Sequence, residues 1–564
     1  AVTTGTENTL IGGLAGDALT TGSHNTYAGY HSGSVATTAA NNTGFGAYTL
    51  DANTSGTSNV AVGKSALGAN TTGSYNVAVG LNAADANTTA GGITAVGFGA
   101  LGSNTTGASN TAVGADSLDA NTTGANNTAL GSAAGGAITT GSSNVLIGSL
   151  AGDALTTASE NTVVGHFAMS NNVLGAKNVA IGTSTLSATN PSSAADMYNV
   201  AVGFQAGNAV TTGTLNTFIG ANSGDAVTTG GQNTALGQNS LGSNTTASNN
   251  TAIGYLALLA NTTGADNVAV GAASLDANTT GDNNTAVGYN ALTANTTADN
   301  NTAVGHDALA VNTEGFNNTA VGSFAMDAVT TGDYNTGLGG FALTGETTGA
   351  GSTAIGYAAL YAQNSTSSAD MFNTAVGNDC LSADTTGVQN TAIGKSALNS
   401  LTTGDNNVGV GVESGAQGAM INIIGEDNRA VFGNNTTTHS YVKVDWTVTS
   451  DQRDKTDITN FTHGLDYANK LRPVNYVWDE RSNYEDGIPD GSKKKSEVQL
   501  GFLAQEVQAI ETGLGIDNNA IVDTEFPDSL KMTNAKLIPV LVNAIQELSA
   551  KNDALEARLT TLEG

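Results

Sequence analysis

Cysteine, proline and aromatic residues are scarce in this chain. Its 564 residues include one cysteine, Cys380, and five prolines, and aromatic residues make up 5%. A single cysteine excludes an intrachain disulfide, and so few large apolar side chains exclude several ordinary globular cores. A chain of this length and composition is either disordered or a repeat fold in which neighbouring units bury one another.

Positive charge is also scarce. The sequence has 17 Lys and Arg against 47 Asp and Glu, for a net charge of −30, and residues 1–440 alone carry −22. Without a basic face we expect no nucleic-acid partner. The six histidines share no spacing, so we expect no metal site and no cofactor. No apolar run is long enough to span a bilayer, and we expect no membrane insertion.

What the sequence has instead is a repeat. The motif Asn-Thr/Val-Ala-Val/Ile-Gly starts at Asn8 and returns every 17 residues until Asn407, with a degenerate copy at Ile93. Two steps measure 21 residues, those that lead to Asn199 and Asn373, and both carry a Ser/Ala/Asp/Met insert. The regular spacing favours a repeat fold over disorder. We expect the two inserts to protrude at matching sites.

The repeat predicts β-structure. In the unit 284–300, Thr285 and Val287 lie on one face of a short strand that ends at Gly288. Helical spacing of apolar residues is absent, so we predict a parallel β-solenoid over residues 1–425 with one unit per coil. The third motif position is usually Ala, which fits either a close contact between faces or subunits or a thin coil without room. The recurrent Asn-x-Thr sequences follow from the repeat, and we do not interpret them as glycosylation sites.

The composition changes near residue 450, and four motifs follow in order. They are Ser-Asp-x-Arg-x-Lys at 450–455, Leu-Arg-Pro-Val-x-Tyr-x-Trp at 471–478, Gly-Phe-x-Ala-Gln-Glu-Val at 501–507, and an apolar helix at 537–548. Together they resemble the C-terminal intramolecular chaperones of phage tail spikes and tail fibres, the endosialidase type. The repeats are similar, less specifically, to the β-rolls of trimeric adhesin heads.

The chaperone resemblance implies a self-cleavage reaction. Ser450 would be the nucleophile, Lys455 would activate it as a neutral amine, and the broken bond would join Thr449 to Ser450. Asp454 departs from the family pattern, where an apolar residue is usual, and it places an acid beside Lys455. A Ser and a Lys at this spacing without the other motifs would be read as an exposed polar turn. No external substrate is implied.

The last helix carries a heptad pattern. Apolar residues fill nearly every a and d position, which indicates a parallel coiled coil, and one polar a residue fixes its register. The a positions are Ile538, Ile545, Asn552 and Leu559, and the d positions are Leu541, Leu548, Leu555 and Leu562. The heptads predict an oligomer, and the resemblance implies that it is a homotrimer.

The sequence thus predicts a mainly β, homotrimeric chain with three parts. These are the solenoid shaft at 1–425, a β neck at 426–449 that includes a strand at Ser440–Val448, and an α+β chaperone domain at 450–564 that ends in a coiled coil at 537–564. The resemblance implies a tail fibre of a phage or phage-like particle, located on the virion or outside the cell. Its expected partners are a host cell-surface receptor or glycan, and a virion or baseplate protein bound through an N-terminal part that this sequence does not include.

Other functions stay open. A bacterial surface adhesin or another extracellular β-solenoid binding protein would share the repeats, although an autotransported adhesin would end in membrane-spanning strands. A fibre-borne glycan hydrolase lacks a candidate pair of acids. Thr ladders on fixed positions would also suit a solenoid that binds ice or another ordered surface.

Overall fold

The computed structural model describes residues 2–365, 369–417, 421–437, 440–441, 443, 448–481, 484–516, 520–524 and 530–564. The chain divides into two compact units, Ala1–Thr437 and Thr438–Gly564, and each is described by itself. The predicted three-part boundaries stay predictions. The predicted neck strand at Ser440–Val448 includes residues outside the described ones.

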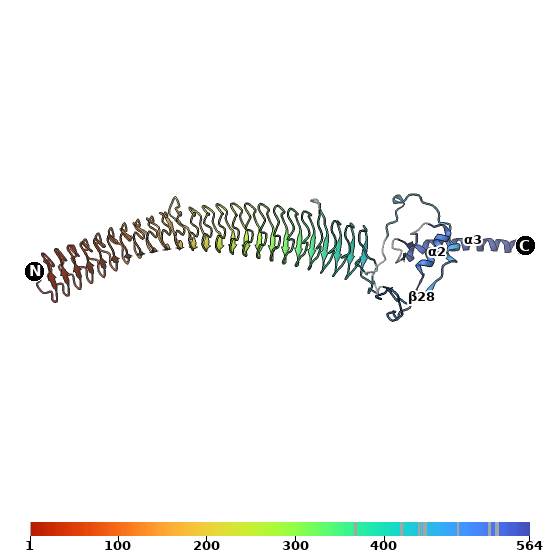
Figure 1. Cartoon of the computed structure of the whole chain (residues 1–564), viewed down its shortest axis with the longest axis horizontal. Coiled ribbons are helices and arrows are strands. Elements are labelled where there is room, and N and C mark those ends of the chain that lie inside the picture. The colour runs from red at the N-terminus through yellow and green to blue at the C-terminus, as the bar shows by residue number, and fades with distance from the viewer. Residues whose placement is uncertain are drawn as a thin grey trace. The chain divides into compact units, whose positions relative to one another are not determined.

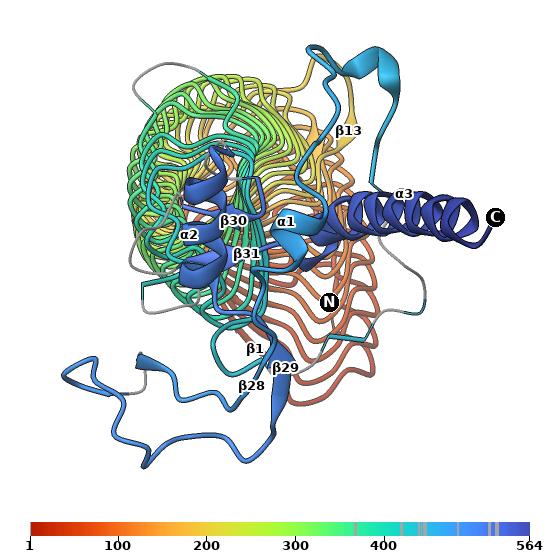
Figure 2. The ribbon, with the colours of Figure 1, turned by 90° about the vertical axis from the view of Figure 1, so that its right-hand side faces the viewer.

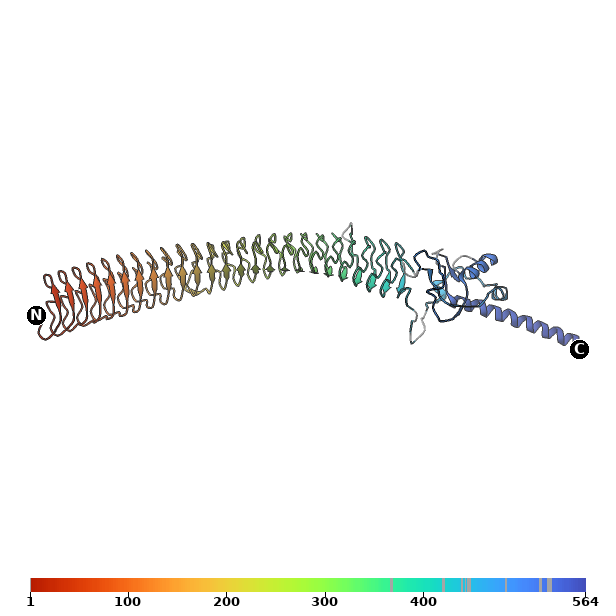
Figure 3. The same cartoon turned by 60° about the horizontal axis from the view of Figure 1, so that its bottom comes forward.

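The first unit is a parallel β-solenoid, as predicted (Figure 1). One 25-stranded sheet runs along it, and each strand pairs in parallel with the next strand of the sheet along the chain. Figure 3 shows these strands as a single row. The strands are β1 (Thr9–Ile11), β2 (Thr26–Ala28), β3 (Thr43–Phe45), β4 (Val60–Val62), β5 (Val77–Val79), β6 (Thr94–Val96), β7 (Thr111–Val113), β8 (Thr128–Leu130), β9 (Val145–Ile147), β10 (Thr162–Val164), β12 (Val179–Ile181), β14 (Val200–Val202), β15 (Thr217–Ile219), β16 (Thr234–Leu236), β17 (Thr251–Ile253), β18 (Val268–Val270), β19 (Thr285–Val287), β20 (Thr302–Val304), β21 (Thr319–Val321), β22 (Thr336–Leu338), β23 (Thr353–Ile355), β24 (Thr374–Val376), β25 (Thr391–Ile393), β26 (Val408–Val410) and β27 (Ala430–Phe432).

The register of the sheet is the sequence repeat itself. Thr285 pairs with Thr302 and Val287 with Val304, so identical motif positions stack from one coil to the next. Stacked strands lie about 4.8 Å apart. Each 17-residue repeat therefore forms one coil, which confirms the predicted parallel β-solenoid.

The interior of each coil is narrow. The middle residue of every strand in this sheet except β1 is buried, and it is Ala in most of them. Opposite it lies an apolar residue such as Leu292, which is fully buried although its backbone is left-handed, with φ of 54°. A left-handed Leu costs on the order of 1 kcal/mol, which burial of its side chain offsets. The small third motif position therefore fills a thin coil, one of the two interpretations that the sequence left open.

Buried asparagines hold the coils together. The backbone N–H of Asn301 donates to Oδ1 of Asn284 at 3.0 Å, and Nδ2 of Asn284 donates to the carbonyl of Ala298 at 2.8 Å. A second ladder joins Asn295 to Asn278 through their side-chain amides at 2.9 Å. Both ladders satisfy polar groups that a dry interior would leave unpaired. Within the repeats, the Asn residues of the Asn-Thr-Thr sequences belong to the second ladder and are buried, which makes them poor glycan acceptors.

The glycine after each strand has no room for a side chain. Gly131 has φ of 141°, and a Cβ there would lie 2.5 Å from the carbonyl oxygen of Gly148 on the next coil. The same relation joins Gly148 to Gly165 and continues through the other coils. Gly136, in the same coil as Gly131, has no positive φ, and its nearest neighbour would be 3.5 Å away. Close stacking of the backbones therefore explains the motif glycine.

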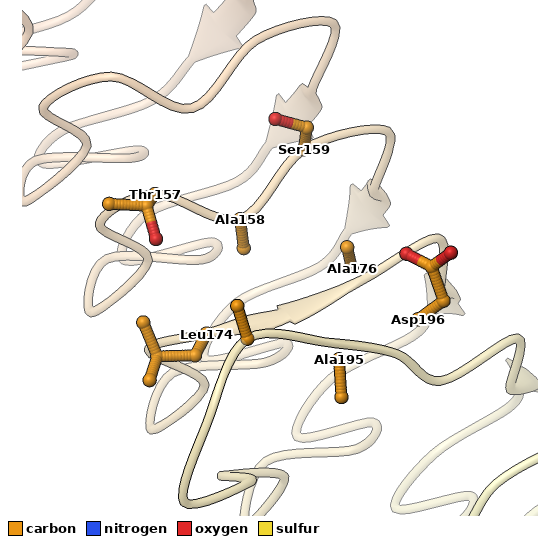
Figure 4. Close-up of a pocket in the computed structure, with 8 residues that line it drawn as sticks. Thr157, Ala158, Ser159, Leu174, Ala176, Ala195 and Asp196 are labelled. Atoms are coloured by element: carbon orange, nitrogen blue, oxygen red, sulfur yellow. The ribbon is translucent and has the colours of Figure 1, made fainter.

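The first 21-residue step forms a side sheet. Strand β11 (Gly175–Ala176) pairs in parallel with β13 (Ala195–Asp196), and the second insert repeats this with a bridge between Ala350 and Asp370. A cleft of about 430 Å³ lies beside the first insert (Figure 4). Its lining includes Thr157, Ala158, Ser159, Leu174, Ala176, Ala194, Ala195 and Asp196.

The second unit is a small α+β domain (Figure 2). Its described elements are η1 (Gln452–Asp454), α1 (Leu465–Ala468), β28 (Val474–Tyr476), β29 (Gln499–Gly501), α2 (Ala504–Leu514), β30 (Val522–Asp523), β31 (Lys531–Met532), η3 (Asn534–Lys536) and α3 (Leu537–Glu563). Strands β28 and β29 pair antiparallel, and so do β30 and β31. A core of six buried side chains joins α1, α2, β30 and α3, namely Tyr467, Val507, Ile521, Val522, Leu537 and Val540.

Candidate self-cleavage site and assembly helix

A tight turn brings Ser450 and Lys455 together. Asp451 caps the 3₁₀ turn η1, because its side chain accepts the backbone N–H of Arg453 at 2.9 Å. The backbone N–H of Lys455 donates to the carbonyl of Gln452 at 3.2 Å and closes the turn. Asp is a favoured capping residue for this reason, so the local sequence itself builds the turn.

The two predicted catalytic groups are in direct contact. Nζ of Lys455 donates a hydrogen bond to Oγ of Ser450 at 2.6 Å. This distance suits proton transfer between a hydroxyl and an amine. Both residues are exposed in the single chain, and so is Thr449 on the other side of the predicted cleavage point.

The charged neighbours of the pair are partly neutralised. Arg453 folds back onto Asp451, with Nη2 2.6 Å from Oδ2. The hydrogen bonds from the Arg453 guanidinium and backbone hold the pKa of Asp451 below its ordinary value. Because of this ion pair, Asp451 is not a free anion beside Lys455. The same ion pair engages Arg453, the one cationic residue within η1. Asp454 is exposed next to Lys455.

The second and third sequence motifs lie side by side. Val474 of β28 pairs with Gly501 of β29, and the side chain of Arg472 forms an ion pair with Glu506 in the first turn of α2. Nε of Arg472 lies 3.0 Å from Oε2 of Glu506, and this contact lowers the pKa of the Glu506 carboxyl. Residues 34 positions apart in the sequence thus form one small substructure.

Helix α3 has one buried and one exposed apolar face. Its first turns bury Leu537, Val540 and Ala544, and Figure 2 shows α1 beside this part of the helix. The predicted seam residues instead face solvent: they are Ile545, Leu548, Asn552, Leu555, Leu559 and Leu562. Leu562 is 82% exposed. The heptad face is therefore not used by the domain's own core.

Sequence reasoning missed the residue that attaches α1 to α3. The carboxylate of Glu547 accepts the backbone N–H groups of Gly464 and Leu465, at 3.0 and 2.8 Å, at the start of α1. An anion at a helix N-terminus satisfies orphan donors there. The partners lie 82 and 83 residues apart, so no local pattern could have revealed them.

The described residues contain no group of three or more His, Cys, Asp or Glu side chains placed to hold a metal ion. Within the same residues, no helix has the length and apolar character needed to cross a membrane.

Comparison with known protein families assigns the C-terminal region. Residues 450–516 match the family described as the chaperone of endosialidase. The match begins at Ser450 and spans the first three motifs. Comparison with curated proteins and with solved structures gave no match. The chain therefore carries an endosialidase-type chaperone domain behind a parallel β-solenoid, the arrangement expected of a tail-fibre-like protein.

Proposed function

We propose that this chain is a homotrimeric tail-fibre protein whose C-terminal chaperone assembles the trimer and is then released by self-cleavage before Ser450. The family match at residues 450–516 carries the proposal, because such a domain implies homotrimer assembly in a fibre- or spike-type protein. The exposed heptad face of α3 supplies a surface for that assembly. The Ser450–Lys455 contact supplies the chemistry for release.

The reaction needs only groups in the chain and water. Oγ of Ser450 attacks the carbonyl carbon of Thr449 while its proton passes to the neutral amine of Lys455. The bond from that carbon to the Ser450 nitrogen then breaks, and the nitrogen takes the proton back from the lysine. The resulting ester is hydrolysed by water, which leaves a carboxylate on Thr449 and a free hydroxyl and amine on Ser450.

We propose that cleavage depends on assembly, because the pair is exposed in the single chain. A lysine acts as a base only when it is neutral, and removal from water is one way to favour that state. In the single chain both side chains face solvent. We infer that a neighbouring copy covers the turn in the trimer, so that release follows assembly instead of preceding it.

Single substitutions test the cleavage. Ser450→Ala and Lys455→Ala should each leave a full-length chain where the parent yields two fragments, and the smaller fragment should begin at Ser450. Lys470→Ala, which removes an exposed lysine paired with Asp466, is the matched control and should cleave like the parent. The measurement is a denaturing gel with N-terminal sequencing. Fragments that persist in Ser450→Ala would refute the proposed nucleophile.

A parent chain that stays intact after trimers have formed would have a different meaning. Asp454 or its surroundings would then have disabled Lys455, and the chaperone would be a permanent cap. Asp454→Leu, which places an apolar residue at this position as is usual in the family, should restore cleavage in that case. The proposed trimer is tested separately, by light scattering of the native protein.

Host attachment is the role that we propose for the shaft. The domain suggests a location on a phage particle or outside the cell, where a rod spans distance to a host receptor or glycan. The cleft beside the first insert is one place where a small polar ligand would fit. Tyr198 is 49% exposed, and its hydroxyl donates to Asp196 of the cleft lining at 3.3 Å. Tyr198→Ala should weaken binding of the fibre to host cells if this cleft is used. A bacterial adhesin with the same solenoid is the alternative.

A further inference from the structure

The solenoid sheet presents a long face that its own coils do not use. We define the sheet face as the side chains of the first and third residues of each strand in the 25-stranded sheet. The middle residue points into the coil, so the first and third point outward. The third residue is apolar in every strand, usually Val, Ile or Leu, and the first is Thr or Val in all but the last strand.

These outward side chains remain accessible to solvent. Every third residue is half-buried or exposed, and Ile11, Phe45 and Phe432 are each more than half exposed. Within the chain, the neighbouring coils cover only the sides of these residues. The apolar third residues therefore add little to the core of the coil. A solvent-exposed sheet face of a monomeric rod would normally carry polar residues at these positions.

The sheet face is also free of charge. None of its residues is Asp, Glu, Lys or Arg, although residues 1–440 carry 26 acidic residues and a net charge of −22. The acids lie on other motif positions, as Asp276, Asp282 and Asp307 do near the middle of the shaft. Two shafts would repel each other through those positions, and the sheet face is a surface along which they can approach without repulsion.

The size of the sheet face matches a specific protein interface. Twenty-five strands at about 4.8 Å give a row roughly 120 Å long, and alternate residues of a strand lie about 7 Å apart. The product is roughly 800 Å² for each chain, which is about one partner's share of a standard interface. Apolar patches much larger than a few hundred Å² are rare on monomers and mark interaction surfaces.

We propose that the sheet face is the surface along which copies of this chain pack in the fibre. The inference rests on the proposed trimer and adds where the shafts meet. A parallel coiled coil of α3 would bring identical rungs of different copies to the same height. Short β-branched residues such as Val270 and Val287 would then interlock in a dry contact, as repeated side chains do between stacked sheets.

Cysteine cross-linking of the full chain tests the proposal. Cys380→Ser first removes the native thiol, and a serine is found at the equivalent position in another repeat, Ser117. Val287→Cys then places a thiol on the sheet face, and Thr280→Cys places one on an exposed position of the preceding coil. With a short bismaleimide, Val287→Cys should yield mainly cross-linked chains and Thr280→Cys mainly single chains. A bulky maleimide should label Thr280→Cys at least tenfold faster.

The outcomes separate the two proposals. If light scattering finds the parent monomeric, both the trimer and the sheet-face contact fail. If the parent is a trimer and the two thiols react alike without cross-links, only the sheet-face contact fails, and the face is open to another ligand such as an ordered surface.

A charge at the same place gives a second, independent test. Val270→Glu should sharply reduce the yield of soluble trimers, because it buries a carboxylate between copies. Thr263→Glu is the matched control and should assemble normally, since Glu314 occupies the equivalent position in another repeat. Equal yields for the two variants would overturn the proposal even if neither cysteine variant folds.

Discussion

Asp384 makes the stability of the shaft depend on pH. It lies at the position of the second Asn ladder and is fully buried. Burial, aided by the nearby carboxylates of Asp405 and Glu346, raises the pKa of its carboxyl to about 8, although hydrogen bonds from the backbone N–H groups of Gly387 and Thr385 oppose the shift. The carboxyl is therefore largely protonated in the folded shaft at neutral pH.

The direction of the pH effect follows from linkage. In the unfolded chain the carboxyl ionises near its ordinary pKa of 3.8, well below the folded value of about 8. The folded state binds the proton more tightly than the unfolded chain. The contribution of Asp384 to the free energy of unfolding is therefore fully present below pH 3.8, and it decreases as the pH rises to about 8. At about 1.4 kcal/mol per pH unit, the loss at pH 7 is on the order of 4 kcal/mol.

The test is Asp384→Asn, which removes the titration and restores the ladder residue. The introduced amide can still accept from Gly387 N–H, which now lies 3.0 Å from Oδ1 of Asp384. Hydrogen exchange of β24 and β25 should show coils that lose protection between pH 5 and 8 in the parent and much less in the variant. Asp379→Asn is the control, because Asp379 is an acidic residue of the same coil that is not buried. If the parent's protection is independent of pH, or if the control behaves like Asp384→Asn, the reasoning is refuted.

Three further perturbations test the shaft and the chaperone. Gly131→Ala should destabilise its coil by about 3 kcal/mol or more, because residues other than glycine rarely adopt its backbone conformation and the new Cβ would clash with the carbonyl of Gly148. Gly136→Ala in the same coil is the control and should leave the thermal melting temperature unchanged. Leu548→Ala with Leu555→Ala should abolish trimers in light scattering while a folded domain core persists by circular dichroism, since both leucines are exposed in the single chain. Glu547→Gln should weaken the attachment of α1 to α3 by about 1–2 kcal/mol in denaturant unfolding, because a neutral amide caps the helix less strongly.

The repeat alone was enough to predict the solenoid. Identical positions 17 residues apart stack directly, as Thr285 on Thr302 shows, so sequence period and structural register are the same quantity. The η1 turn was also open to prediction, because Asp451 is a capping residue beside the Ser450–Lys455 pair. The sequence did not predict which side of the strand faces inward. In a Thr-Ala-Val strand the Ala can lie either inside a thin coil or at a close contact between faces or subunits.

Contacts between distant segments were beyond the sequence patterns. Glu547 caps α1 from 82 residues away, and only the folded arrangement of α1 and α3 brings them together. The raised pKa of Asp384 likewise depends on complete burial inside a coil. An acid that replaces Asn in one repeat looks like ordinary variation until the interior is known. Sequence patterns thus predict the regular structure well and the exceptional residues poorly.

The near identity of the coils would explain why a shaft packed in the proposed way needs a chaperone at its end. If copies pack through the sheet face, a shift of one copy by a single rung, about 4.8 Å, replaces Val287 by Val304 and costs almost nothing. The shaft by itself therefore specifies its partner but not its register. The terminal helix is not degenerate in this way, because Asn552 is the one polar residue at an a or d position of its seam. In the proposed trimer, alignment set by this helix would fix the register of every rung of the shaft, and once the rungs had interlocked the aligning domain would no longer be needed.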